Sequence, residues 1–378
     1  MDYFFVYFFL RAILLFILIV TGYFISQKQS IDQRNYWILS ILAMIIYSLI
    51  EGLRYNRGTD YTYYKEMYEY ALNLKSYMDI DSVEPMIGFI NKPFRYIGLS
   101  YPYIFVFYSF ILIFAGFFFI EKNHRVALFA IPMFFMSTIV QSENLVRQFI
   151  AFSFVLLSVN YFLTNRWIKF CMLMLMAYLT HTSSIIFLPF FFLIKYVKNP
   201  FGNLLAIIVL YITSWLWKPE YWGNFVQYFQ MIQLDDFKYS GYIDNADDWF
   251  SGEKLLDFNV STFSLVRLFL FNTGIIILGY RILEKYRDTH YPFFYFLFVF
   301  GAIFQRYTDQ MELLYRIDLY FYMFWFIVLA YITYDTFYSE SKNTDSKFIC
   351  YFLIFNVLYD FLIPHGEIDP LKYLFIWN

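Results

Sequence analysis

The chain has 378 residues, of which 60% are hydrophobic, 26% aromatic and only 15% charged. Soluble domains carry roughly a quarter charged residues, so this composition excludes an ordinary soluble globular protein. The formal net charge of −2 provides no surplus of cations for a polyanion, which argues against a nucleic-acid partner. Cys171 and Cys350 both fall in apolar runs, so the sequence predicts neither a disulfide framework nor a thiolate metal site.

Apolar runs of about 15 to 25 residues recur along the chain, the length that crosses a hydrocarbon core of roughly 30 Å. They predict an all-α, polytopic membrane protein of about twelve transmembrane helices. The first run lacks a basic n-region and a cleavage site, so we expect a retained helix and not a signal peptide. The predicted spans lie near residues 3–26, 36–53, 101–120, 126–141, 149–164, 168–181, 183–195, 203–217, 262–280, 291–305, 318–337 and 348–363.

One region allows two interpretations. Between residues 168 and 195, the segment His181–Thr182–Ser183 separates two short apolar runs. We interpret the pattern as two short helices, with one broken helix as the alternative.

The distribution of Lys and Arg predicts the orientation. Six short connections each carry Lys or Arg, four of them two or more, and we place all six in the cytoplasm: 27–35, 121–125, 165–167, 196–202, 281–290 and 338–347. The segment 218–261 holds eight acids against three lysines, and the segment 54–100 is the other long connection. We therefore expect a single transmembrane domain, 1–378, with two long external loops, 54–100 and 218–261, and with the working surface outside.

A polar, tyrosine-rich segment follows the second predicted span and begins with Arg54 and Arg57. The planar arginine fork donates two hydrogen bonds at once, which suits a phosphate. Gly58 and Asp60 predict a turn, with Thr59 or Asp60 capping a helix. Three tyrosines of that helix share one face: Tyr61, Tyr64 and Tyr68. The structural alternative is that the arginines snorkel to the interface and the tyrosines form an aromatic belt.

Glu84 and Pro85 predict the start of a surface helix that also carries Asn91. The helix dipole favours a carboxylate at this position, so Glu84 is either a reactive acid or an ordinary capping residue. His181 is flanked by hydroxyl residues between two apolar runs, a pattern typical of the irregular backbone that lines cavities in membrane proteins. It could donate to a phosphate or accept a proton, or it could be structural. No second His or Cys stands at ligand spacing, so we expect no metal.

Arg147 and Gln148 stand at the external mouth of a predicted span, where an ionisable residue is a functional candidate. Glu143 precedes Arg147 by four residues, so an ordinary ion pair within one helix is the alternative. At another external mouth, Arg316 and Asp318 are two residues apart and do not face each other on a helix. Tyr320 follows them. For the intramembrane cations Arg11 and Arg267, snorkelling is the simplest interpretation.

These motifs, taken in order, resemble the EpsG-like branch of the Wzy-type polysaccharide polymerases over roughly residues 50–325. The resemblance rests on Gly58–Tyr61, Glu84–Pro85 with Asn91, Arg147–Gln148, His181 with Ser183–Ser184, and Arg316 with Tyr320–Phe321. The acid-rich loop 218–261 matches no pattern of the family. The resemblance implies a GT-C-like helical glycosyltransferase without a cofactor. It further implies a polymerase of lipid-linked repeat units that makes O-antigen (lipopolysaccharide), capsule or exopolysaccharide at the outer face of the bacterial cytoplasmic membrane.

The expected partners are a polyprenyl-diphosphate-linked oligosaccharide, for example on undecaprenyl diphosphate, the lipid bilayer and a chain-length regulator protein. We expect Arg147, Arg316 and Arg54 or Arg57 to bind the diphosphate, because preorganised cations stabilise the charge that develops on it. Tyr61 and Tyr64 would stack on sugars. The polar candidates Asn91, Gln148 and Tyr320 complete the expected binding set.

The base is one of Asp60, Glu84 and His181. Brønsted reasoning favours His181 or Glu84, with Asp60 orienting arginines or a sugar hydroxyl. Two other functions remain open: a flippase of the same lipid-linked unit, and a membrane acyltransferase that modifies glycans. The cationic candidates cluster at the external side, which favours the polymerase over the flippase.

Overall fold

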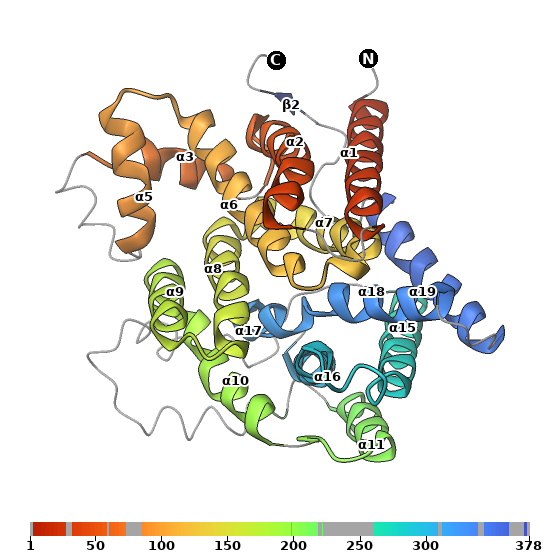
Figure 1. Ribbon diagram of the computed structural model, residues 1–378. Coiled ribbons are helices and arrows are strands. Elements are labelled where there is room, and N and C mark those ends of the chain that lie inside the picture. Colours follow the sequence, from red (N-terminus) through yellow and green to blue (C-terminus); the bar gives the residue numbers. More distant parts are fainter. Residues whose placement is uncertain are drawn as a thin grey trace, which may run out of the picture. The chain divides into compact units, whose positions relative to one another are not determined.

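The computed structural model describes residues 3–27, 32–58, 60–72, 85–197, 199–217, 221, 261–308, 312–338, 344–362 and 374–375. Over these residues the chain is almost entirely helical (Figure 1). The first elements are α1 (Tyr3–Ser26), α2 (Gln33–Gly52), β1 (Arg54–Tyr55), α3 (Tyr61–Glu69), α5 (Pro85–Tyr96), α6 (Tyr101–Glu121), η1 (His124–Val126), α7 (Ala127–Asn144), α8 (Val146–Leu163) and α9 (Trp167–Thr180). They are followed by η2 (Thr182–Ile186), α10 (Phe187–Tyr196), α11 (Leu204–Ser214), α15 (Thr262–Arg281), α16 (Tyr291–Thr308), α17 (Glu312–Tyr322), α18 (Trp325–Tyr338), α19 (Thr344–Leu362) and β2 (Leu374–Phe375).

Every predicted apolar run contains a helix, which confirms the helical fold class. Among the described residues, seven helical stretches are long and apolar enough to span a membrane: Phe8–Ser26, Gln33–Gly52, Tyr101–Glu121, His124–Asn144, Val146–Leu163, Thr262–Arg281 and Tyr315–Tyr338. Three shorter apolar helices accompany them: Trp167–Thr180, Thr182–Tyr196 and Leu204–Ser214. The chain is therefore a multi-pass membrane protein by helix length and composition, whereas the count of about twelve crossings and the GT-C architecture are not confirmed.

The region around His181 consists of two helices joined by a 3₁₀ turn. Helix α9 ends at Thr180, and His181 takes an extended conformation with φ −157° and ψ 111°. The 3₁₀ turn η2 then leads into α10. The two-helix interpretation is therefore confirmed, and the broken backbone puts His181 at a helix end.

The chain divides into two compact units. The first comprises Met1–Leu188 with Leu329–Asn378, and the second comprises Pro189–Val328. In the first unit α2 packs against α6, α1 against α7, and α8 against α9, whereas in the second α16 packs against α17. Helices α2 and α6 approach very closely because Gly52 has no side chain: an added Cβ would lie 2.2 Å from the Cα atom of Val106.

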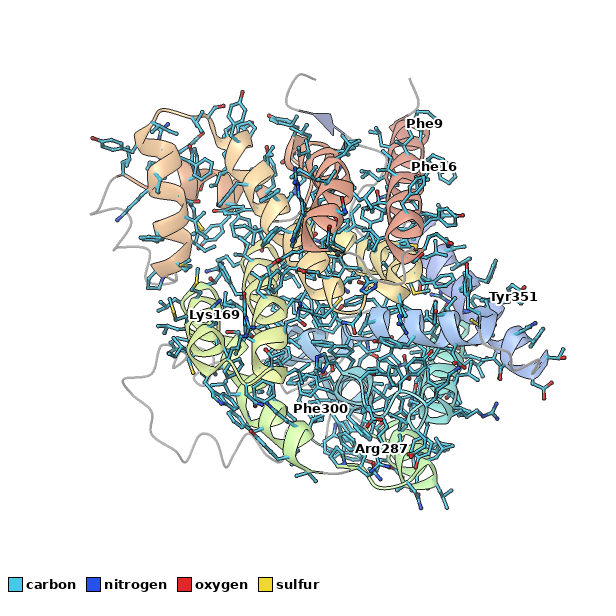
Figure 2. The ribbon with its side chains drawn as sticks, viewed as in Figure 1. Phe9, Phe16, Lys169, Arg287, Phe300 and Tyr351 are labelled. Atoms are coloured by element: carbon cyan, nitrogen blue, oxygen red, sulfur yellow. The ribbon has the colours of Figure 1, made fainter. Side chains whose placement is uncertain are left out.

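Large apolar side chains cover the outer face of α1. Phe9 and Phe16 are seven residues apart and therefore share a face of the helix, and they are 63% and 67% exposed (Figure 2). Such a face is suited to lipid. Strand β2 pairs antiparallel with β1 in the same unit, with Arg54 opposite Phe375 and Tyr55 opposite Leu374.

Candidate functional site

The site begins at the turn that follows α2. Gly58 has a positive φ of 101°, which favours glycine. The turn also lies against the end of α7, where a Cβ on Gly58 would be 2.4 Å from the carbonyl oxygen of Glu143. The predicted turn at Gly58 is therefore confirmed, and it is docked on a helix that is distant in sequence.

Among the described residues, five buried arginines and glutamates gather around this turn, and we call them the charge cluster: Arg11, Glu51, Arg54, Arg57 and Glu143. The Arg57 guanidinium lies at its centre, 2.8 Å from a carboxylate oxygen of Glu51 and 2.8 Å from one of Glu143. Arg11 approaches Glu143 from α1, at 4.0 Å. Taken by themselves, these three arginines and two glutamates carry one surplus positive charge. A buried charge is tolerated when it is paired, which these contacts provide.

The cluster corrects two sequence interpretations. A snorkelling arginine carries its charged head to water, but the side chains of Arg11 and Arg57 are only 3% and 2% exposed and lie in ion pairs. Arg11 also donates to the carbonyl of Phe361 at 3.4 Å and lies 5.4 Å from the centre of its ring. Glu51 escaped the sequence analysis altogether, although an acid in the last turn of an apolar span is itself a signal of function.

Arg54 is held differently from Arg57. Its guanidinium donates to the backbone carbonyl of Glu51 at 2.9 Å and lies 5.2 Å from the centre of the Phe105 ring. The ring of Tyr61 stacks on Phe105 with centroids 5.0 Å apart. Burial lowers the pKa of Arg54, and the negative charge of Glu143 opposes that fall. Arg54 is thus a buried cation that contacts the Phe105 ring and lies beside the ion pairs of Arg57.

Arg147 lies on the other side of a helix break. Helix α7 ends at Asn144 and α8 begins at Val146, so Glu143 and Arg147 do not share one continuous helix. The intrahelical pair that their spacing allows is therefore wrong, and Glu143 pairs with Arg57 and Arg11. Gln148 is buried in the first turn of α8.

Helix α3 is fixed to the start of α8 through its tyrosines. The backbone N–H of Arg147 donates to the hydroxyl of Tyr64 at 3.4 Å, and the Arg147 guanidinium lies 5.7 Å from the centre of the Tyr63 ring. Burial raises the pKa of Tyr64, and the positive charge of Arg147 opposes that rise. Tyr61, Tyr64 and Tyr68 share a buried face, as predicted. Since Tyr61 and Tyr64 are 3% and 5% exposed, sugar stacking by them stays a prediction.

Asp60 occupies the N-cap position of α3, as predicted, but its side chain makes no capping hydrogen bond. It is half-buried, three residues after Arg57. Asn91 is buried on α5 and accepts a hydrogen bond from Tyr108. Glu84 and Thr59 lie outside the described residues.

His181 lies on the same unit as the charge cluster. Two contacts set the register of α8 and α9: the Ser158 hydroxyl to the Met174 sulfur at 3.3 Å, and the rings of Phe162 and Phe170 at 4.9 Å. The two helices are therefore antiparallel. If the same register continues to the end of α9, His181 lies beside a level of α8 that is about one helical turn from Arg147.

The remaining candidates belong to the second unit. Helix α17 carries Arg316, which is half-buried, together with the buried residues Asp318 and Tyr320. Elsewhere in this unit Arg306 stacks on Trp215 at 3.9 Å. The structure thus brings Arg54, Arg57, Asp60, Arg147 and His181 to one unit, while Arg316 and Tyr320 are placed only within the other.

Comparison with known proteins gives one match. No curated protein and no solved structure matches the chain. Among the described residues, no group of three or more His, Cys, Asp or Glu side chains could hold a metal ion. The model of the EpsG family matches residues 36–375, which include every member of the charge cluster except Arg11. The chain therefore belongs to the EpsG family.

Proposed function

We propose that this protein is a polysaccharide polymerase that joins polyprenyl-diphosphate-linked oligosaccharide units at the outer face of a bacterial cytoplasmic membrane. Membership of the EpsG family indicates a membrane protein of the polysaccharide-polymerase type. The observation that carries the proposal is the charge cluster, in which three arginines and two glutamates are buried beside the start of α8. A buried surplus of positive charge favours an anionic ligand, and the diphosphate of the carrier lipid is such a ligand.

The proposed reaction is a glycosyl transfer. An acceptor sugar hydroxyl attacks the anomeric carbon of the donor unit, and a glycosidic bond forms as the bond to the diphosphate oxygen breaks. The hydroxyl proton passes to a base of the protein, and the polyprenyl diphosphate leaves with the electron pair of the broken bond. No nucleotide sugar takes part, because the diphosphate-linked unit is already activated.

The residues of the first unit fit these tasks. Arg54, Arg57 and Arg147 come from different elements, and two of them are held by neighbouring carboxylate or carbonyl oxygens. Such preorganised donors stabilise charge that develops in the transition state, and the loss of one costs about 10²–10³ in rate. Asp60 and His181 supply candidate bases, each worth about 10²–10⁴. Arg316 lies in the second unit and stays a candidate from the sequence alone.

A null mutant tests the function through its surface glycan. Polymerase loss should leave a single repeat unit on the lipid core, because export still delivers single units to the outer face. Loss of a flippase would instead leave no repeat unit outside. A ladder of normal polymer in the null mutant would refute the proposal.

Arginine variants test the site in the same strain. Arg147→Lys and Arg316→Lys keep the charge but lose the bidentate fork, so both should shorten the polymer strongly at normal protein levels. Arg287→Lys is the matched control, because Arg287 is exposed and pairs with Glu284 on the same short connection. Unchanged polymer length in both test variants would remove these arginines from the site.

A further inference from the structure

Glu143 is assigned no bond and no proton in the reaction proposed above, yet it contacts two arginines and the Gly58 turn. Its carboxylate lies 2.8 Å from Arg57 and 4.0 Å from Arg11, and its side chain is 2% exposed. That carboxylate holds two guanidinium groups, and a proton taken up by Glu143 would remove the negative charge that holds them. Its role must therefore act through its neighbours.

The backbone of Glu143 also belongs to the site. Its carbonyl oxygen is the atom against which Gly58 packs, and the side chain of the next residue, Asn144, lies on the same contact. Helix α7 ends at Asn144, and Arg147 follows in the first turn of α8. One residue thus touches Arg57 with its side chain and the Gly58 turn with its backbone, while it stands four positions before Arg147.

Arg11 contributes to the charge balance of the cluster. It shares Glu143 with Arg57 and is anchored separately, by the carbonyl and the ring of Phe361. If Glu143 loses its charge, three arginines of the cluster face one glutamate, and the repulsion between the guanidinium groups rises. Loss of Arg11 as well would return the surplus of the cluster to a single positive charge.

We infer that Glu143 is a positioning residue, which holds Arg57 in place for the anionic leaving group and sets the charge of the cluster jointly with Arg11. The inference rests on the proposed function, since it takes the diphosphate as the ligand of the arginines. A misplacement of about 1 Å at a reacting centre can reduce the rate about 10²-fold, so Glu143→Gln should lower kcat by about that factor. The double variant Glu143→Gln with Arg11→Gln should recover most of the loss, and Arg11→Gln alone should lose less than Glu143→Gln.

The test is a double-mutant cycle on the full-length purified protein in nanodiscs, with lipid-linked repeat units as substrate. Rates are compared with thermal midpoints, so that a loss of folded protein is not taken for a loss of turnover. Glu284→Gln and Arg287→Gln form the control cycle, because this pair is also a glutamate and an arginine, at 3.2 Å, but is exposed (Figure 2 labels Arg287). The control cycle should show no coupling in kcat.

Three results would overturn the inference. Glu143→Gln with a normal kcat would show that Arg57 is held without it. A loss that Arg11→Gln leaves unrescued, together with loss of one limb of the pH–rate profile, would make Glu143 itself the proton acceptor. If the Glu143→Gln protein does not accumulate in the membrane, Glu143→Asp and the double variant are measured in its place. A double variant that folds but stays inactive contradicts the charge balance.

A binding measurement separates this inference from the proposed function. Farnesyl diphosphate serves as the probe, and its Kd is measured on the same four proteins without any polymerisation. The variant Glu143→Gln carries a larger positive surplus, so weaker binding to it can only come from misplaced arginines; such weakening, with recovery in the double variant, supports the role of Glu143 even if the wild-type protein forms no polymer. Equal or tighter binding to Glu143→Gln than to wild type overturns the role, while a wild-type protein that binds the probe but makes no polymer refutes only the polymerase.

Discussion

The turn at Gly58 gives the sharpest test of how the site is assembled. In Gly58→Ala the backbone must hold a φ of 101° with a side chain present, which costs about 1–3 kcal/mol. The new Cβ would also lie 2.4 Å from the carbonyl oxygen of Glu143. Relief of such an overlap by backbone movement costs about 1–3 kcal/mol more. The substitution should therefore destabilise the docked turn by about 2–6 kcal/mol and displace Arg57 from its ion pairs.

Gly98→Ala is the matched control for Gly58→Ala. Gly98 also has a positive φ, 77°, but an added Cβ there meets nothing within 4 Å. Both variants bear the backbone strain, and only Gly58→Ala bears the overlap with Glu143. The assay is the glycan ladder in cells with the thermal midpoint of the purified protein. If the two variants shorten the polymer equally, the docking of the turn on α7 does not govern activity and the reasoning fails.

Two further predictions concern topology and the base. Cysteine tags within 230–255 should be labelled from outside the cytoplasmic membrane and tags within 338–347 should not, because the short connections are basic. The opposite labelling would move the site to the cytoplasmic face. In pH–rate profiles of purified single variants, His181→Gln or Glu84→Gln should remove the limb that reports the base, while Asp60→Asn should lower the rate and leave the limb in place. Asp60→Asn that abolishes turnover at every pH, with the other two near wild type, would make Asp60 the base.

The helices were predictable because each is a local property of the sequence. An apolar run long enough to span the bilayer must satisfy its own backbone hydrogen bonds, and a helix does so within the run. A helix end was predictable where a polar residue interrupts the run, as at His181, and the turn before α3 was predictable from Gly58. The number of crossings was less predictable, because several helices are shorter than the bilayer requires.

The individual residues of the site were predictable from the sequence, but their contacts were not. Arg54, Arg57 and Arg147 stand out in the sequence because ionisable residues at the ends of apolar spans are candidates for function. Sequence spacing suggested that Glu143 pairs with Arg147, but the break between α7 and α8 removes that geometry. It also offered no partner for Arg11, because the partner lies more than a hundred residues away in the chain.

The sequence by itself determined the helical membrane fold and the family to which the chain belongs, since both depend on local composition or on motifs in order. The tertiary structure alone decided that Arg11, Glu51, Arg57 and Glu143 form one buried cluster. The reason is physical: a buried charge must find an opposite charge in space, and the packing of α1, α2 and α7 chooses which one it meets.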